Sequence, residues 1–273
     1  MIPPMIHPTA IIDPRAQLDP SVEVGPFAVV DGDVSVGPDC RIGPYVYLTG
    51  HTTIGAGNRF FAGCVIGEAP QDVKYKDEPA RLEIGGHNLF REGFTAHRSA
   101  VPGEATVIGS HNFLMVNSHV GHNVRLGNHV ILANGALLAG HVEVGDRAFI
   151  SGNCLVHQFT RVGTLSLMQG GARISKDLPP FTIARGANGL GGLNTIGLRR
   201  AGFSSAERLE LKQLYHLLFR ARGKFSAALA AAEKTFTSPR ARTLLDFAAS
   251  SKRGLCMDSA SPENESEADI EGD

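Results

Sequence analysis

An apolar residue recurs at every sixth position over most of the first 174 residues. The series runs from Ile12 to Ile66 and, after two interruptions, from Ile108 to Ile174. The next residue is often glycine, and the fifth residue of each six-residue repeat, or hexad, is often small. Such a period is typical of repeat proteins, in which one repeat cannot bury its own apolar face and must stack on its neighbours.

The hexads predict a mainly β fold: a left-handed parallel β-helix of hexapeptide repeats over residues 1–181. Three hexads form one triangular coil of about 18 residues, and successive coils stack at roughly the 4.8 Å spacing of paired strands. We expect the aliphatic residue inside and the following glycine at the corner. Cys40, Cys64 and Cys154 share the small inward position, so we interpret them as core residues.

The interruptions and the C-terminal part follow other patterns. The polar stretches 67–83 and about 97–107 are expected to leave the β-helix as loops, and long structured loops are often functional. Residues 182–203 are expected to be a connector. From Ser204 a capping box precedes a helical stripe of apolar residues, so we expect a small α-helical domain at 204–255.

Charge is unevenly distributed along the 273 residues. Seven acidic and no basic residues follow Arg253, which predicts a disordered acidic tail at 256–273. The remainder has 26 basic and 20 acidic residues, a net charge of +6. This mildly basic body favours an anionic substrate or partner.

The chain shows no feature of an exported or membrane protein. No apolar run approaches the roughly 20 residues of a membrane helix. The first residues lack the basic and apolar regions of a signal peptide. The four cysteines show no CxxC spacing. We therefore expect a cytoplasmic protein in a reducing environment, without a membrane span.

Several histidines fall close together once the coil is considered. His122, His141 and His157 are expected near one edge on three consecutive coils, with His119 on the strand leading to the same corner. His129 belongs to a different hexad and is expected at the surface. A histidine cluster that faces a cleft suits general base catalysis, in which an imidazole takes a proton from a hydroxyl.

Two other interpretations of these histidines remain open. Trimeric β-helices of the γ-carbonic-anhydrase type bind zinc through three histidines, two of them five residues apart. No two histidines here have that spacing, and Asn117 stands five residues before His122. Other zinc geometries remain open. A purely structural β-helix is disfavoured by the clustered histidines and by the loop at 67–83.

Six stretches together point to one family: IGEAPQDVKY, NSHVGH, LAGHV, VHQF, KDLPPF and GLRRAGF. Through them the chain resembles the UDP-N-acetylglucosamine O-acyltransferases, which catalyse the first step of lipid A synthesis. The resemblance implies a homotrimer with active sites between subunits. It implies transfer of a 3-hydroxyacyl chain from acyl carrier protein to the 3-hydroxyl of UDP-N-acetylglucosamine, with no cofactor and no nucleic-acid partner.

The resemblance also implies residue roles. His122 would be the general base that deprotonates the sugar hydroxyl, and the backbone N–H of Gly140 would stabilise the oxyanion. Gly170 aligns with the position that limits acyl length, which implies a long chain. The expected substrate-binding residues are Asp72, Lys74, His119, His141, His157, Gln158, Asn194 and Arg200.

These binding residues divide between the two ends of the sugar nucleotide. Asp72 and Lys74 would reach the glucosamine across the subunit interface. Gln158, Asn194 and Arg200 would hold the nucleotide, with Arg200 facing phosphate.

Two positions depart from the family pattern. Asn123 follows the catalytic histidine where the family often has Asp. Its oxygen can accept the ring N–H and set the tautomer, but it supplies no charge, so the rate is expected to suffer unless another carboxylate substitutes. Ala201 stands where some members carry Arg, so one phosphate contact is expected to be missing.

An N-acyltransferase is the nearest alternative. The later lipid A enzyme that acts on an amino sugar normally has an additional domain before its hexads, whereas here the hexads begin near residue 12. A variant of the O-acyltransferase that accepts a 3-amino-3-deoxy sugar remains open.

Overall fold

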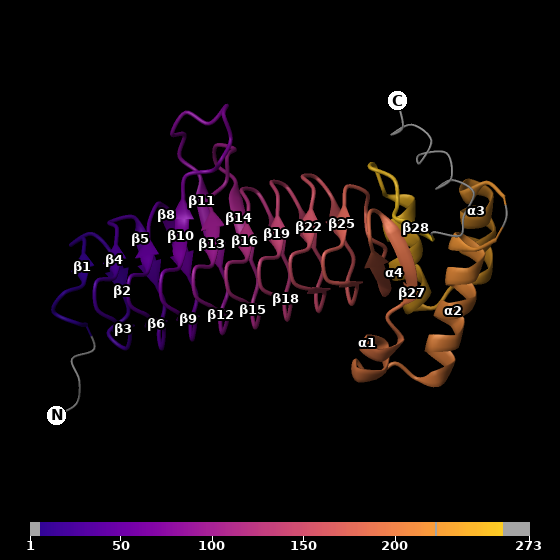
Figure 1. The fold of residues 1–273 in the computed structure, drawn as a ribbon, viewed down its shortest axis with the longest axis horizontal. Helices are drawn as coiled ribbons and strands as arrows, with labels where there is room; N and C mark the ends of the chain where they lie inside the picture. Colours follow the sequence, from indigo (N-terminus) through magenta and orange to yellow (C-terminus); the bar gives the residue numbers. More distant parts are fainter. Residues whose placement is uncertain (1–5, 222, 259–273) are drawn as a thin grey trace.

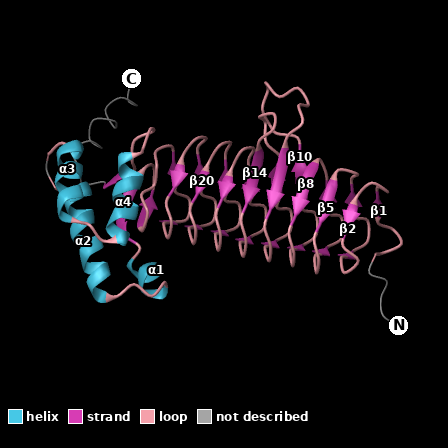
Figure 2. Cartoon of the chain, turned by 180° about the vertical axis from the view of Figure 1, so that it is seen from behind, coloured by secondary structure: helices cyan, strands magenta, loops and turns pink. Residues whose placement is uncertain are grey.

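The chain forms a long three-sided prism with helices gathered at its C-terminal end (Figures 1 and 2). The computed structural model describes residues 6–221 and 223–258. The prism consists of short parallel strands, and every pairing among β1 to β25 joins strands that lie three places apart in the chain. The prediction of a parallel β-helix followed by a small helical part is confirmed.

Each face of the prism is one sheet. The first sheet contains β1 (Ile11–Ile12), β4 (Val29–Val30), β7 (Tyr47–Leu48), β10 (Val65–Glu68), β13 (Thr95–His97), β16 (His119–Val120), β19 (Leu137–Leu138), β22 (Leu155–Val156) and β25 (Arg173–Ile174). The second contains β2 (Gln17–Leu18), β5 (Val34–Val36), β8 (His51–Ile54), β11 (Arg81–Ile84), β14 (Ala105–Ile108), β17 (Arg125–Leu126), β20 (Glu143–Val144) and β23 (Arg161–Val162). The third contains β3 (Glu23–Val24), β6 (Arg41–Ile42), β9 (Arg59–Phe60), β12 (Leu89–Phe90), β15 (Phe113–Leu114), β18 (Ile131–Leu132), β21 (Phe149–Ile150), β24 (Leu167–Met168), β26 (Thr182–Arg185), β27 (Gly189–Leu193) and β28 (Met257–Asp258).

The aliphatic residue of each hexad forms the core. Successive side chains of a strand point to opposite faces, so the second residue of a two-residue strand is buried while the first faces outward. In β15 and β18 the pairing of Leu114 with Leu132 places equivalent residues of successive coils above one another. Both side chains are fully buried. Cys40, Cys64 and Cys154 are also fully buried, as their position in the repeat predicts.

The corners depend on two positions of the hexad rather than on the glycine alone. The third residue after the aliphatic one takes the left-handed conformation, as at Asn123 (φ 59°) and Asn153 (φ 55°). Asparagine adopts this conformation more readily than most residues do. The glycine directly after the aliphatic residue is required instead by close coil stacking, because a Cβ on Gly121 would lie 2.8 Å from the carbonyl oxygen of Leu138.

Both loops are shorter than the sequence predicts, because the flanking strands are longer. Only residues 69–80 lie between β10 and β11, where 67–83 were expected. Only residues 98–104 lie between β13 and β14, where about 97–107 were expected. The longer loop projects from the prism (Figure 1).

The expected connector is ordered and continues the prism. β26 pairs with β24 in parallel, so strand stacking extends to Arg185, and β27 turns back antiparallel to β26. Four helices follow: α1 (Thr195–Arg200), α2 (Ser205–Phe219), α3 (Phe225–Thr235) and α4 (Pro239–Ala249). The capping box at Ser204 and Glu207 is present as predicted. Among the described residues, no helix is both long and apolar enough to cross a membrane.

The prediction that disorder begins at residue 256 is wrong for the first three residues of the tail. β28 pairs with β27, and Cys256 and Asp258 are buried. The Asp258 carboxylate accepts hydrogen bonds from Tyr215 Oη at 2.9 Å and Arg220 Nε at 2.8 Å. Composition predicted a solvated acid here, whereas these partners stabilise a buried one. The rest of the expected tail, 259–273, lies outside the described residues.

Candidate active site

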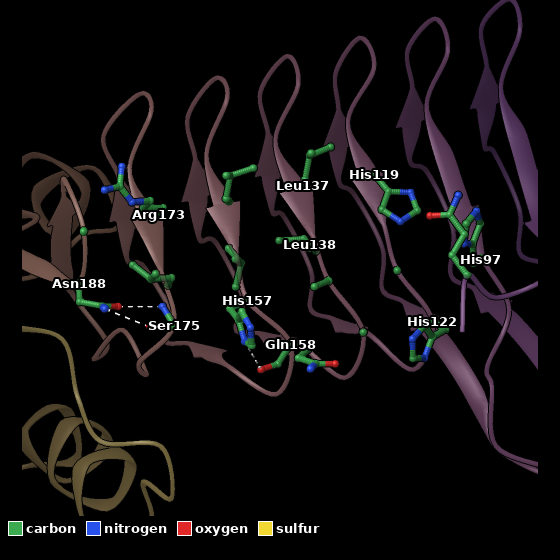
Figure 3. A pocket seen from close by; sticks show the side chains of 18 residues that line it. His97, His119, His122, Leu137, Leu138, His157, Gln158, Arg173, Ser175 and Asn188 are labelled. Carbon is green, nitrogen blue, oxygen red and sulfur yellow. Dashed lines mark hydrogen bonds between the residues drawn. The ribbon is translucent and has the colours of Figure 1, made fainter. Parts of the chain in front are cut away.

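A cavity of about 760 Å³ extends along the first sheet, over β13, β16, β19, β22 and β25 (Figure 3). Imidazoles gather at one end and other polar side chains at the far end, with apolar side chains between them. The three groups, in that order, are His97, His119 and His122; Leu137, Leu138, Leu155 and Val156; and Arg173, Ser175 and Asn188. The cavity therefore has a histidine cluster at one end and, next to it, an apolar floor formed by Leu137, Leu138, Leu155 and Val156.

The His122 ring is held in one tautomer by Asn123. Its Nδ1 lies 3.0 Å from Asn123 Oδ1, and the backbone N–H of Ala100 donates to the same atom at 2.9 Å. A backbone N–H can only donate, so the side-chain atom facing both groups must be the amide oxygen. His122 Nδ1 must then carry the proton. Its Nε2 is left with a free lone pair, which is the state that a general base requires.

Asn123 is itself fixed on every side. Its backbone N–H donates to Thr106 Oγ1 at 2.7 Å. Its side-chain Nδ2 donates to Ser99 Oγ at 2.7 Å and to Glu104 Oε2 at 3.0 Å. Ser99 and Glu104 both belong to the short loop 98–104, so this loop orients the partner of His122.

Gly140 lies against the other nitrogen of the His122 ring. A Cβ at Gly140 would lie 2.5 Å from both Cε1 and Nε2 of His122, so only glycine fits beside the ring. The backbone N–H of Gly140 donates to no other described residue. A backbone amide without a partner is able to donate to a negatively charged oxygen bound next to it.

Two further imidazoles at this end are neutral near pH 7. Burial, together with the neighbouring His97 and His122, lowers the pKa of His119 to about 4. Burial likewise lowers the pKa of His97, whose ring lies edge-on to His119 at 4.8 Å. His119 Nδ1 is hydrogen-bonded to Thr95 Oγ1 at 2.7 Å, whereas His97 Nδ1 is buried without a partner among the described residues.

His141 lies at the same corner of the prism as His122 but one coil later, and outside the main cavity. Its ring stacks on Phe159 at 4.5 Å and is perpendicular to His122 at 5.3 Å. Burial lowers its pKa. It lines a second groove of about 550 Å³ together with Glu104 and Asn123, and does not line the main cavity. Among the described residues, no group of three or more His, Cys, Asp and Glu is arranged to hold a metal ion.

Comparison with known proteins identifies the family. Residues 177–256 match the model for domain 2 of UDP-N-acetylglucosamine O-acyltransferase, and residues 105–140 match the bacterial transferase hexapeptide model of six repeats. A Burkholderia lata protein named acyl-[acyl-carrier-protein]–UDP-N-acetylglucosamine O-acyltransferase is 47% identical over 258 residues, covering 92% of this chain and 98% of the relative. The chain belongs to the UDP-N-acetylglucosamine O-acyltransferase family.

Solved structures of UDP-N-acetylglucosamine acyltransferases share the whole fold. The Francisella novicida enzyme has a TM-score of 0.90 at 32% identity, with 94% of this chain and 95% of that chain covered. The Moraxella catarrhalis enzyme has a TM-score of 0.89 at 37% identity, with 92% and 99% covered. These matches and the hexapeptide repeats confirm the left-handed β-helix.

The structure brings only part of the expected site together within one chain. Five of the expected residues line the main cavity: His119, His122, Gly140, His157 and Gln158. Within this set, His157 Nδ1 lies 3.2 Å from the backbone oxygen of Gln158 (Figure 3).

The remaining expected residues lie elsewhere. Asp72 and Lys74 are in the loop 69–80, whose Gln71 lines the cavity. Asn194 caps α1 by accepting from the N–H of Gly197 at 3.0 Å, and Arg200 is exposed at the end of α1. Gly170 is in the turn after β24.

The sequence analysis missed His97 and Glu104. Both follow the loop 69–80, and the second loop begins directly after His97, so the six-residue count fails in this coil. Thr95 pairs with His119 at an offset of 24 residues instead of the regular 18. Alignment of the coils across the loops, rather than counting through them, would have placed His97 beside His119.

Proposed function

We propose that this protein transfers a 3-hydroxyacyl chain from acyl carrier protein to the 3-hydroxyl of UDP-N-acetylglucosamine, the first step of lipid A synthesis. The names of its relatives supply the donor and the acceptor. The observation that supports the chemistry is the His122–Asn123 hydrogen bond beside the free amide of Gly140. It provides a base and an oxyanion donor at one end of a cavity.

The reaction needs only these groups and the substrates. His122 Nε2 takes the proton of the sugar hydroxyl as the oxygen attacks the thioester carbonyl. The carbonyl oxygen becomes an oxyanion, which accepts a hydrogen bond from the Gly140 N–H. When the tetrahedral intermediate collapses, the new ester forms and the carbon–sulfur bond breaks. The departing thiolate takes the proton back from His122.

The low pKa values of the neighbouring histidines favour this chemistry. His97 and His119 are neutral near pH 7, so they add no positive charge beside His122 when its ring becomes an imidazolium. Neutral imidazoles can also hydrogen-bond sugar hydroxyls as donors or acceptors. We propose that His119, His141 and His157 contact the sugar or the acyl carrier.

The apolar floor suits the acyl chain. Leu137 and Leu155 face outward and are 40% and 46% exposed, an arrangement that favours a hydrocarbon ligand. Gly170 leaves open space, because a Cβ there would have only the carbonyl oxygen of Gly152 nearby, at 3.7 Å. We propose that this space admits a long acyl chain.

We also propose a homotrimer with shared sites. The third sheet carries an apolar outward stripe, and apolar faces of parallel sheets are normally covered. Its members are Leu89, Phe113, Ile131, Phe149, Leu167 and Ile183. Asp72 and Lys74 would reach the glucosamine of the neighbouring site, and Gln158, Asn194 and Arg200 would hold the nucleotide. The four free, buried cysteines agree with a cytoplasmic location.

Acyl transfer to UDP-N-acetylglucosamine, followed by mass spectrometry, tests the function. We expect product with wild type, a loss of about 10²- to 10⁴-fold in His122→Ala, and little change in His111→Ala, an exposed histidine outside the cavity. Product only with the 3-amino-3-deoxy analogue would identify an N-acyltransferase. Product with neither acceptor would refute the enzymatic proposal.

A further inference from the structure

We propose that Glu104 is a positioning residue that supplies, through Asn123, the negative charge absent from the residue after the general base. This inference rests on the proposed role of His122. Glu104 makes no hydrogen bond to the His122 ring. It acts through the side-chain amide of Asn123, which is hydrogen-bonded to both residues. The expected substitute carboxylate is thus contributed by the short loop 98–104.

The loop 98–104 is folded around the Asn123 amide. Its Ala100 N–H donates to Oδ1, while Ser99 Oγ and Glu104 Oε2 accept from Nδ2. Ser99 is held in turn by Val101, whose backbone N–H donates to Ser99 Oγ at 3.0 Å. Ala100 and Ser99 are neutral partners that fix the orientation of the amide. Glu104 is the one charged partner among these contacts.

The charge of Glu104 acts on His122 by polarising the amide. A carboxylate that accepts the Nδ2–H draws positive charge to that end and makes Oδ1 a stronger acceptor for His122 Nδ1–H. The effect grows when His122 takes the sugar proton, because the ring then becomes positive. No proton passes through Asn123, which stays neutral throughout.

The size of the effect is limited by solvent. Glu104 is exposed in the single chain and shares its groove with Arg125, His141 and Glu143, so its field is screened. We therefore expect a change of about threefold to tenfold in kcat, well below the effect of removing His122 itself.

Asn123 and Glu104 are suited to each other. Position 123 is buried and left-handed, where asparagine is favoured, and its Nδ2 faces a carboxylate oxygen at 3.0 Å. An aspartate at this position would place a second carboxylate oxygen there and the two groups would repel each other. We therefore expect the Glu104 carboxylate to raise kcat when residue 123 is asparagine and to lower it when residue 123 is aspartate.

A double-mutant cycle of kcat and KM tests this dependence. Glu104→Gln keeps a side-chain oxygen that can accept from Asn123 Nδ2 but removes the negative charge. We therefore expect kcat to fall about threefold to tenfold, with the KM values for the acyl donor and for UDP-N-acetylglucosamine nearly unchanged. In the Asn123→Asp background the same substitution is expected to raise kcat, because the aspartate supplies its own charge and loses its repelling neighbour. Glu83→Gln, which removes an exposed carboxylate of β11 outside both grooves, is the matched control and is expected to change nothing.

A second measurement needs no turnover. In ¹⁵N-histidine-labelled protein, Glu104→Gln is expected to shift the Nδ1 resonance of His122, while Glu83→Gln leaves it in place. The proposal is overturned if Glu104→Gln changes neither kcat nor this resonance. It is also overturned if Glu104→Gln changes kcat in the same direction in the wild type and in the Asn123→Asp variant. Full activity of His122→Ala would instead refute the proposed base, and the resonance would still report whether Glu104 acts on the ring.

Discussion

The N-terminal coils, residues 11–66, and the central coils, residues 95–174, share one kind of interior but differ at the corner between the first and second sheets. In the N-terminal coils this corner carries the surface ion pair of Asp13 and Arg15, at 3.0 Å. In the central coils it carries His122 and the amide that orients it. The repeat therefore specifies the coil, while the corner residues are free to specify chemistry.

The outward face of the third sheet also differs between the two regions: it is charged in the N-terminal coils and apolar in the central coils. Glu23 and Arg41 lie outside in the N-terminal coils, where they form a 3.3 Å ion pair. Phe113 and Phe149 occupy the equivalent outward positions in the central coils. The inward residues stay apolar in both parts, so the two regions differ in residues that the core does not constrain.

The largest expected effect comes from one methyl group placed at equivalent corners. Gly32 and Gly140 are both the second residue after an inward aliphatic residue. A Cβ at Gly32 would meet the flexible Arg15 side chain, 2.6 Å from Nε, whereas at Gly140 it would meet the His122 ring, which Asn123 holds in place. We expect Gly140→Ala to lower kcat about 100-fold or more and Gly32→Ala to leave it unchanged.

Steady-state kinetics with a thermal unfolding curve for each variant check this pair. Both proteins are expected to fold, since the Gly32 variant needs only a movement of Arg15 and the Gly140 variant a movement of one ring. Equal loss of activity in the two variants would mean that corner strain, rather than the position of His122, controls the rate.

The next effect concerns the apolar stripe of the third sheet. Phe149→Glu places a charge where we propose that subunits meet, so we expect the trimer to dissociate. Arg41→Glu, at the equivalent position of an N-terminal coil, is expected to keep the trimer. Sedimentation equilibrium measures both masses. An unchanged mass for Phe149→Glu would exclude this stripe as the interface.

The sequence predicts the fold better than it predicts the site, because the core positions repeat from coil to coil and the corner positions do not. Inward positions such as Leu114 and Leu132 repeat because every coil needs the same buried side chain, so the period alone predicts them. Corner positions carry no such repeat. The 18-residue coil grouped His122 with other histidines, but its expected role and the departure at Asn123 came from the resemblance to the family.

The contacts that complete the site depend on loops, which interrupt the period. Glu104 reaches Asn123 only because the loop 98–104 folds back, and no spacing in the sequence predicts that approach. Asp258 was counted as part of a solvated tail because composition cannot show that Tyr215 and Arg220 would bury and pair it. Side-chain contacts between distant segments therefore require the structure.

A smaller effect is expected on stability at low pH. His119 has a folded pKa of about 4, below its ordinary value of 6.5, so the unfolded chain binds more protons between these values. Stability is therefore lost as the pH falls from about 6.5 towards 4, by about 2 kcal/mol from this group at pH 5. His119→Asn should reduce the difference in unfolding free energy between pH 7 and pH 5 by about that amount.

Urea unfolding at the two pH values measures this difference. Leu137→Asn is the matched control, because Leu137 pairs with His119 on the next coil and has no titrating group. We expect its difference between pH 7 and pH 5 to equal that of the wild type. A pH dependence unaltered in His119→Asn would show that burial does not hold this ring neutral.

The smallest effect is expected at another corner of the same coils, where three histidines also stack. His87, His111 and His129 lie face to face, with ring centroids 5.1 and 5.0 Å apart, but all three are exposed and outside the cavity. His129 is left-handed, with φ 56°, a conformation that asparagine accepts. We expect His129→Asn to change the unfolding free energy by less than about 0.5 kcal/mol and kcat by less than about twofold. Urea unfolding and steady-state kinetics measure both values. A larger fall in kcat would mean that a column of histidines contributes to catalysis without an orienting amide, and that the chemistry does not depend on the His122 corner alone.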